Sequence, residues 1–243
     1  MIRSSNPVFK KIKGMDYEAH SYKEASYAGV GAKVLYYLLI TVVGAFLGLY
    51  LFNAVPSTYI TILLVSGLIG FISAVLAMVK PNLSLVFGSI YCLCEGLFLG
   101  VVSMIFETIV PGVVITAVAA TFAIVLVSAV MFMSGLIKIT KKFYKFILMA
   151  TIGFVVTMVL VFIFQLLGFI NTDSTGFAII VGLISVVLAS FYLMLDMEQA
   201  RQLVEGGGPK EMEWMVSFGI SYTVLWIYIE VLRIAVVLLA NKD

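Results

Sequence analysis

Residues 221–239 read SYTVLWIYIEVLRIAVVLL, a run that is almost entirely apolar yet contains Glu230 and Arg233. An α-helix needs about 20 predominantly apolar residues to cross the hydrocarbon core of a bilayer, and this run comes close to supplying them by itself. An acid and a base inside such a helix are costly unless they face other protein groups or water. The stretch therefore predicts a membrane helix whose charged residues have a partner or a function.

The same pattern recurs along the rest of the chain. The 243 residues are 63% hydrophobic and 12% charged, against about 45–50% and 25% in an ordinary soluble domain. The runs are continuously apolar, whereas the strands of a membrane barrel alternate at every second residue. The sequence therefore predicts an all-α, polytopic membrane protein, a bundle of seven transmembrane helices. The predicted spans cover residues 34–53, 57–79, 82–106, 112–137, 143–169, 176–199 and 213–239.

The basic residues predict the orientation of this bundle. All Lys and Arg residues except Arg233 and Lys242 lie before the first, after the second, after the fourth or after the sixth span. The positive-inside rule then places the amino terminus in the cytoplasm and, after seven crossings, the carboxyl terminus outside the cell membrane. We expect a cytoplasmic amino-terminal segment, residues 1–33, and a transmembrane domain, residues 34–240. A last segment that re-enters the membrane without crossing it would change this parity.

Several classes of function have no support in the sequence. The net charge of +2 reflects topology, and the basic soluble surface of a nucleic-acid-binding protein is missing. The only histidine, His20, lies in the polar amino-terminal segment, so histidine-dependent catalysis within the bilayer is not expected. Cys92 and Cys94 have no further cysteine with which to complete a metal site. We therefore expect neither enzymatic activity nor a resident cofactor.

Three acids remain inside the apolar spans once Glu198 and Glu213, at the ends of their spans, are interpreted as cytoplasmic helix-end residues. Glu95 lies near the middle of the third span, Asp196 in the cytoplasmic part of the sixth, and Glu230 in the seventh. A charged side chain at the centre of a membrane helix costs roughly 2.5–3.5 kcal/mol, which makes each acid a candidate ion-binding or pH-sensing group. The alternative for each is a structural hydrogen bond between helices. Arg233, three positions after Glu230, is placed to pair with it locally, either as simple neutralisation or while Glu230 faces a second acid.

Three motifs near the carboxyl terminus resemble a known family. They are LMLDMEQA at the end of the sixth span, the turn EGGGPKEMEW, and WIYIEVLRI in the seventh span. These look like the carboxyl-terminal signature of the Bax inhibitor family, and the opening SSNPVF is similar to its bacterial, YccA-like branch. The resemblance covers nearly the whole chain, although its specific part is the last 50 or so residues.

The resemblance implies a central seventh helix and one acid on each of the last two helices, which together form a pH-sensitive latch on a calcium leak pathway. Matched by motif, these acids are Asp196 and Glu230, the second being Glu where the best-described pattern has Asp. In a straight hairpin that turns near Gly208, the two acids would differ in depth by about 15 Å of helix rise. Glu95 is therefore a rival partner for Glu230.

The predicted function is a pH-sensitive cation leak channel or transporter, with Ca²⁺ as the expected ion. Two carboxylates that meet in a low-dielectric interior share a proton and titrate as a coupled pair. The protonated pair would close the path, and the deprotonated pair, Asp196 and Glu230, would offer Ca²⁺ transient oxygen ligands. The expected partners are the lipid bilayer, protons and cations. The alternative is a non-transporting regulatory protein that restrains a membrane protease or stress-response partner through residues 1–33.

Overall fold

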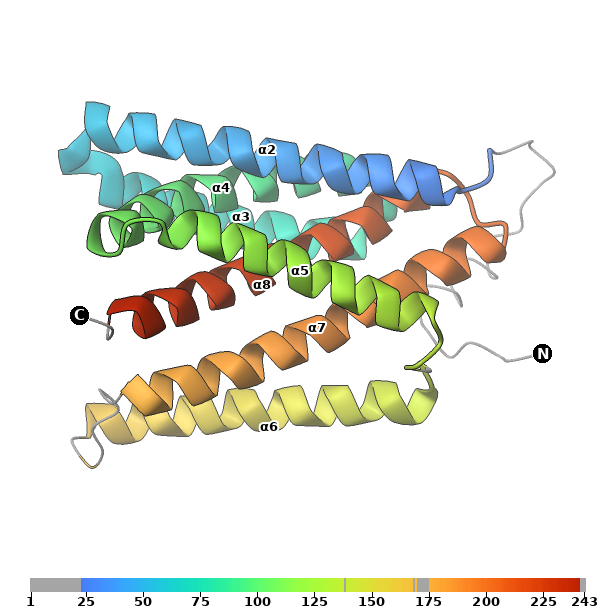
Figure 1. The fold of residues 1–243 in the computed structure, drawn as a ribbon. Helices are drawn as coiled ribbons and strands as arrows, with labels where there is room; N and C mark the ends of the chain where they lie inside the picture. Colours follow the sequence, from blue (N-terminus) through green and yellow to red (C-terminus); the bar gives the residue numbers. More distant parts are fainter. Residues whose placement is uncertain (1–22, 138, 168, 170–174, 241–243) are drawn as a thin grey trace.

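The structure, a computed structural model, describes residues 23–137, 139–167, 169 and 175–240. This part of the chain forms seven long α-helices, one short 3-10 helix and no strand, and each long helix is apolar enough to span a membrane. The predicted all-α, seven-helix fold is therefore confirmed (Figure 1). The elements are α2 (Tyr27–Ala54), α3 (Pro56–Val79), η1 (Pro81–Leu83), α4 (Ser84–Ile109), α5 (Val113–Met133), α6 (Lys141–Leu166), α7 (Thr175–Glu205) and α8 (Met212–Ala240).

Some helix ends differ from the limits of the apolar runs. α2 begins at Tyr27 rather than at residue 34, because Ser26 caps it by accepting a hydrogen bond from the Gly29 N–H at 3.0 Å. α7 likewise continues to Glu205, beyond the apolar run that ends at residue 199. Hydropathy identifies only the part of a helix that lies in hydrocarbon. Backbone hydrogen bonding can extend the helix beyond that part into polar residues. Residues 1–22, with His20, and residues 241–243 lie outside the described residues.

α8 is the central helix of the bundle. It packs against α2, α3, α4, α5 and α7, and Figure 1 shows it running between the α2 to α4 group and α7. α6, in contrast, packs only against α7 among the described helices and buries Ile147 alone. Other apolar side chains of α6, such as Met149 at 72% exposure, would contact lipid tails, as expected for a transmembrane helix at the edge of a bundle.

The close approach of α2 and α4 depends on glycines. A Cβ atom added to Gly96 of α4 would meet the backbone oxygen of Thr41 and lie 2.9 Å from the Cα atom of Gly44 in α2. Gly48 and Gly100 extend the same contact by one turn. The small-residue patterns Gly44-x-x-x-Gly48 in α2 and Gly96-x-x-x-Gly100 in α4 therefore pack against each other.

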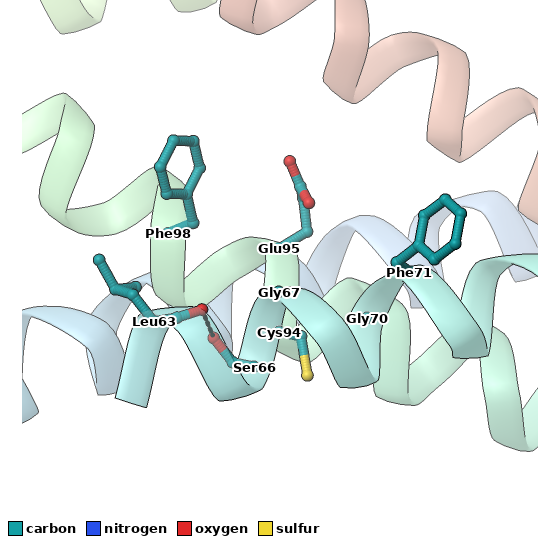
Figure 2. Close-up of a pocket in the computed structure, with 8 residues that line it drawn as sticks. All are labelled: Leu63, Ser66, Gly67, Gly70, Phe71, Cys94, Glu95 and Phe98. Carbon is teal, nitrogen blue, oxygen red and sulfur yellow. Dashed lines mark hydrogen bonds between the residues drawn. The ribbon is translucent and has the colours of Figure 1, made fainter. Parts of the chain in front are cut away.

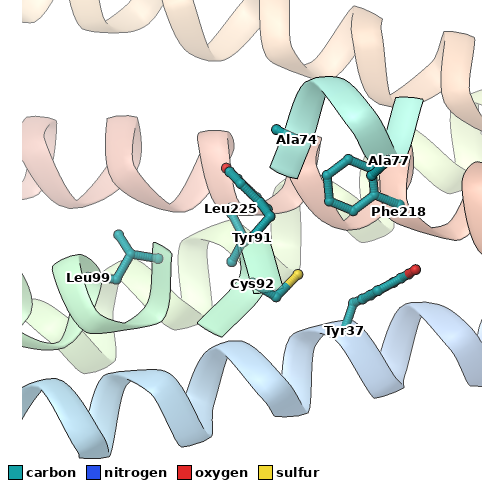
Figure 3. Packing of buried hydrophobic residues seen from close by; sticks show 8 residues of the cluster. All are labelled: Tyr37, Ala74, Ala77, Tyr91, Cys92, Leu99, Phe218 and Leu225. Carbon is teal, nitrogen blue, oxygen red and sulfur yellow. The ribbon is translucent and has the colours of Figure 1, made fainter. Parts of the chain in front are cut away.

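An aromatic core joins α2, α4 and α8 (Figure 3). Phe218 of α8 lies edge-on to Tyr91 of α4 and to Tyr37 of α2, with ring centroids 5.4 and 5.7 Å away. Cys92 is fully buried in this core. In the described part of the chain, no three His, Cys, Asp or Glu side chains gather closely enough to hold a metal ion. By its position, Cys92 contributes to the packing of this core.

Candidate ion site between α7 and α8

Asp196 lies on α7 where this helix faces α8. Its Oδ2 atom accepts a hydrogen bond of 2.6 Å from the Thr223 hydroxyl of α8. Gly219, one turn earlier on α8, lies beside the carboxylate, since a Cβ atom there would be in ordinary contact with Asp196 Oδ1 at 3.6 Å. Within the described residues, no Lys or Arg side chain forms an ion pair with Asp196. A neutral hydroxyl is therefore the hydrogen-bonding partner that α8 offers to this acid.

Glu230 lies on the same face of α8, seven residues beyond Thr223. Seven residues are about two helical turns, or about 10 Å along the axis. Glu230 Oε2 accepts a hydrogen bond of 2.5 Å from Arg233 Nη2, so the local pair that the spacing predicts is present. Arg233 Nη2 also reaches α7, where it would lie 3.6 Å from a Cβ atom on Gly182. Both ionisable groups therefore lie along the interface between α7 and α8.

The structure does not bring Asp196 and Glu230 into contact. Asp196 bonds to Thr223, whereas Glu230 bonds to Arg233. Along α8, Glu230 lies about 10 Å beyond the level of Asp196 and Thr223. It is the acid further from the α7–α8 turn, as the residue spacing predicts. The two acids share an interface and one face of α8, and their action as a latch stays a prediction.

Glu95 occupies a separate place, on the α4 side of α8. It lines a cavity of about 100 Å³ between α3 and α4. Figure 2 shows its carboxylate pointing away from Cys94 and toward the same side as Phe71 and Phe98. Its electrostatic neighbours are Tyr91 and Tyr222. The structure therefore does not form the rival pair of Glu95 with Glu230.

Glu213, which its sequence position does not mark as a site residue, is the most buried acid among the described residues. It lies in the first turn of α8, has no exposed side-chain surface, and forms an ion pair with Lys33, which is 11% exposed. Its Oε1 atom accepts a hydrogen bond of 2.7 Å from the Ser26 N–H. By sequence position alone, Glu213 is a helix-end residue and Lys33 is a topology signal. A recognisable signal was present, because Glu213, Ser217 and Ser221 recur every four residues and share a buried face of α8.

Replacing Thr223 with Val should test the interhelical bond at Asp196. Val keeps the shape of Thr but removes the donor, so we expect the free energy of unfolding to fall by about 0.6–2 kcal/mol, the range for hydrogen bonds between membrane helices. Thermal unfolding in detergent, compared with Thr157→Val, measures this. Thr157 is a suitable control because its hydroxyl bonds only to the Gly153 carbonyl of its own helix. Equal losses in both variants would show that the α7–α8 bond adds nothing.

Comparison with known proteins identifies one family. A family model described as Bax inhibitor 1 like matches residues 6–240. The match spans every helix described above and includes Glu95, Asp196, Glu230 and Arg233. It is consistent with the bacterial YccA-like branch without distinguishing it. A search of curated proteins gave no match.

Proposed function

The chain belongs to the Bax inhibitor 1 like family, and from this premise we propose that it conducts cations, with Ca²⁺ as the expected ion, along the α7–α8 interface under the control of protons. Its seven apolar helices make it a multi-pass membrane protein. We propose that it lies in the cell membrane with one end of the bundle, here called the basic end, toward the cytoplasm. Lys33 of α2, Arg201 of α7 and Lys210 of the α7–α8 turn lie at this end. The proposal assigns it no catalytic role and no resident cofactor.

The observation that carries the proposal is that Asp196 lies between two helices and has no ion pair with a basic side chain in the described part of the chain. An ionised carboxylate in a low-dielectric interior is costly unless an opposite charge or hydrogen bonds compensate it. Either a proton or a bound cation would remove that charge. Asp196 is therefore suited to exchange one for the other, and oxygen atoms such as those of Asp196 and Thr223 are the ligands that Ca²⁺ prefers.

In the proposed cycle, the path is closed when Asp196 is protonated and bonded to Thr223. Loss of the proton leaves a negative charge that attracts a cation to the α7–α8 interface. The cation then moves toward Glu230, about 10 Å further along α8. Because the deprotonated form conducts, the flux should rise with pH.

Arg233 controls the step at Glu230. Its positive charge neutralises Glu230 at rest and repels an approaching cation. Only one Arg233 nitrogen bonds to Glu230, and its Nε atom is buried without a hydrogen-bond partner among the described residues. A single-point contact is weaker than the bidentate pairing that a guanidinium group can form, and the Arg233 side chain is 40% exposed. We propose that it swings aside and frees Glu230 for the cation.

Calcium flux into proteoliposomes, measured across a range of pH, tests this function. Asp196→Asn should abolish the pH dependence and lower the flux by about tenfold or more, which corresponds to about 1.4 kcal/mol at the site. Glu230→Gln should lower the flux and retain part of the pH dependence. Glu211→Gln removes an exposed acid near the start of α8 and should change neither quantity.

The outcomes separate the competing assignments. Wild-type flux and pH dependence in the double variant Asp196→Asn, Glu230→Gln would refute the transport proposal and leave the regulatory alternative. A change caused by Glu95→Gln alone would move the site to the cavity between α3 and α4.

A further inference from the structure

The chain before α2 is bonded to the turn between α7 and α8. The Ala25 N–H donates a hydrogen bond of 2.8 Å to the Gly208 carbonyl, and the Lys210 N–H donates one of 2.9 Å to the Lys23 carbonyl. We call residues 23–26 the strap. Backbone bonds in both directions hold the strap across the basic end of these two helices, as in a pair of antiparallel strands.

Glu213 fastens the strap to α8. Its carboxylate accepts the 2.7 Å hydrogen bond from Ser26 N–H and forms the buried ion pair with Lys33. Lys33 also donates to the Lys210 carbonyl at 3.3 Å and lies 4.9 Å from the centre of the Trp214 ring. These contacts compensate both buried charges, and the loss of either partner would leave the other uncompensated.

The strap covers one end of the interface that contains Asp196. Ala25 belongs to a buried apolar cluster formed with the last turns of α7 and the first turns of α8. On α7, the cluster residues Ala200 and Leu203 lie four and seven residues after Asp196, on the same face of the helix. On α8, Val216 and Met212 lie about one and two turns before Gly219. An ion or water molecule would therefore have to pass this cluster to reach Asp196 from the basic end. The other members of the cluster are Val30, Ala200, Leu203, Met212 and Val216.

We propose that the strap is an autoinhibitory gate, which closes the path from the basic end to Asp196 while Glu213 holds it and opens the path when these contacts are released. The proposal extends the function proposed above to its regulation and depends on that function only for what passes through the gate. Movement of the strap itself is independent of transport.

Cysteine labelling tests the gate without any measurement of transport. Ala200 of the cluster is replaced with Cys in a chain whose Cys92 and Cys94 are changed to Ala, and the protein in nanodiscs is treated with a charged thiol reagent. We expect Glu213→Gln to raise the labelling rate about tenfold or more, because removal of one partner from a buried ion pair favours local opening. Glu211→Gln, at the exposed acid two positions earlier, should leave the rate unchanged. Equal rates in all three proteins would overturn the proposal.

A reversible crosslink provides the second test and leaves the Glu213–Lys33 ion pair in place. Glu24 and Pro209 are paired in an antiparallel bridge, and directly opposite residues in such a pair lie about 4.5–5.5 Å apart at Cα, within the range for a disulfide. Glu24→Cys with Pro209→Cys, in the chain lacking Cys92 and Cys94, should form a lock on oxidation. We expect the oxidised protein to conduct Ca²⁺ about tenfold less than the same protein after reduction.

The two tests distinguish the two proposals. Equal flux in the oxidised and reduced forms of a conducting protein would refute the gate. If no form conducts but Glu213→Gln still accelerates labelling of Ala200→Cys, the strap is a gate and the proposed cation transport is wrong.

Discussion

Replacing Glu213 with Leu should lower the free energy of unfolding by about 3–5 kcal/mol, because it leaves the Lys33 ammonium without its counter-charge in a nearly buried position. Lys33 is only 11% exposed and Glu213 has no exposed side-chain surface, so water cannot replace the lost partner. The Ser26 N–H would lose its acceptor as well. Thermal and denaturant unfolding in detergent would measure the loss.

A double-mutant cycle supplies the control for this prediction. Lys33→Met combined with Glu213→Leu removes both charges, and the double variant should be more stable than the sum of the single losses predicts. Glu211→Leu changes an exposed acid in the same segment and should shift stability by less than about 0.5 kcal/mol. Strictly additive losses at Lys33 and Glu213 would contradict the ion pair.

Replacing Gly96 with Leu should cost about 3 kcal/mol or more, since overpacking at a site without free space forces the backbone to move. The atoms that a side chain would meet are the Thr41 carbonyl oxygen and the Gly44 Cα atom, both backbone atoms of α2. Neither can rotate away, so α2 and α4 would have to separate.

Gly153→Leu is the matched control for this change. Gly153 lies within α6, and no atom lies within 4 Å of a Cβ atom added there. We expect this variant to unfold at the wild-type temperature or slightly above it, because leucine is a better helix former than glycine. A similar loss of stability in both variants would mean that helix insertion, rather than the α2–α4 contact, is what Gly96→Leu disturbs.

The helices were predictable because continuous hydropathy reports directly on transfer into hydrocarbon. Their ends were less so, since α2 and α7 continue through polar residues that hydropathy counts as loop. Tyr27 and Ser26 illustrate the difference, because a single capping hydrogen bond sets where α2 begins.

The same distinction applies to the candidate site. The Glu230–Arg233 pair was predictable, because residues three apart on a helix are neighbours whatever surrounds them. The partner of Asp196 was not, because contact with Thr223 depends on the register between two helices. Glu213 was missed for a related reason. Acids near a helix end usually face water, and only the packing of α2 shows that this one is buried.

Infrared spectroscopy of the carboxyl groups tests the central claim most directly, namely that Asp196 exchanges a proton for a cation. The carbonyl stretch of a protonated carboxylic acid is distinct from that of a carboxylate, so it reports the protonation state without any assay of transport. We predict a protonated-acid band that is absent in Asp196→Asn and that decreases when Ca²⁺ is added at constant pH. A wild-type spectrum that Ca²⁺ leaves unchanged, or a band that persists in Asp196→Asn and still responds to Ca²⁺, would contradict the account.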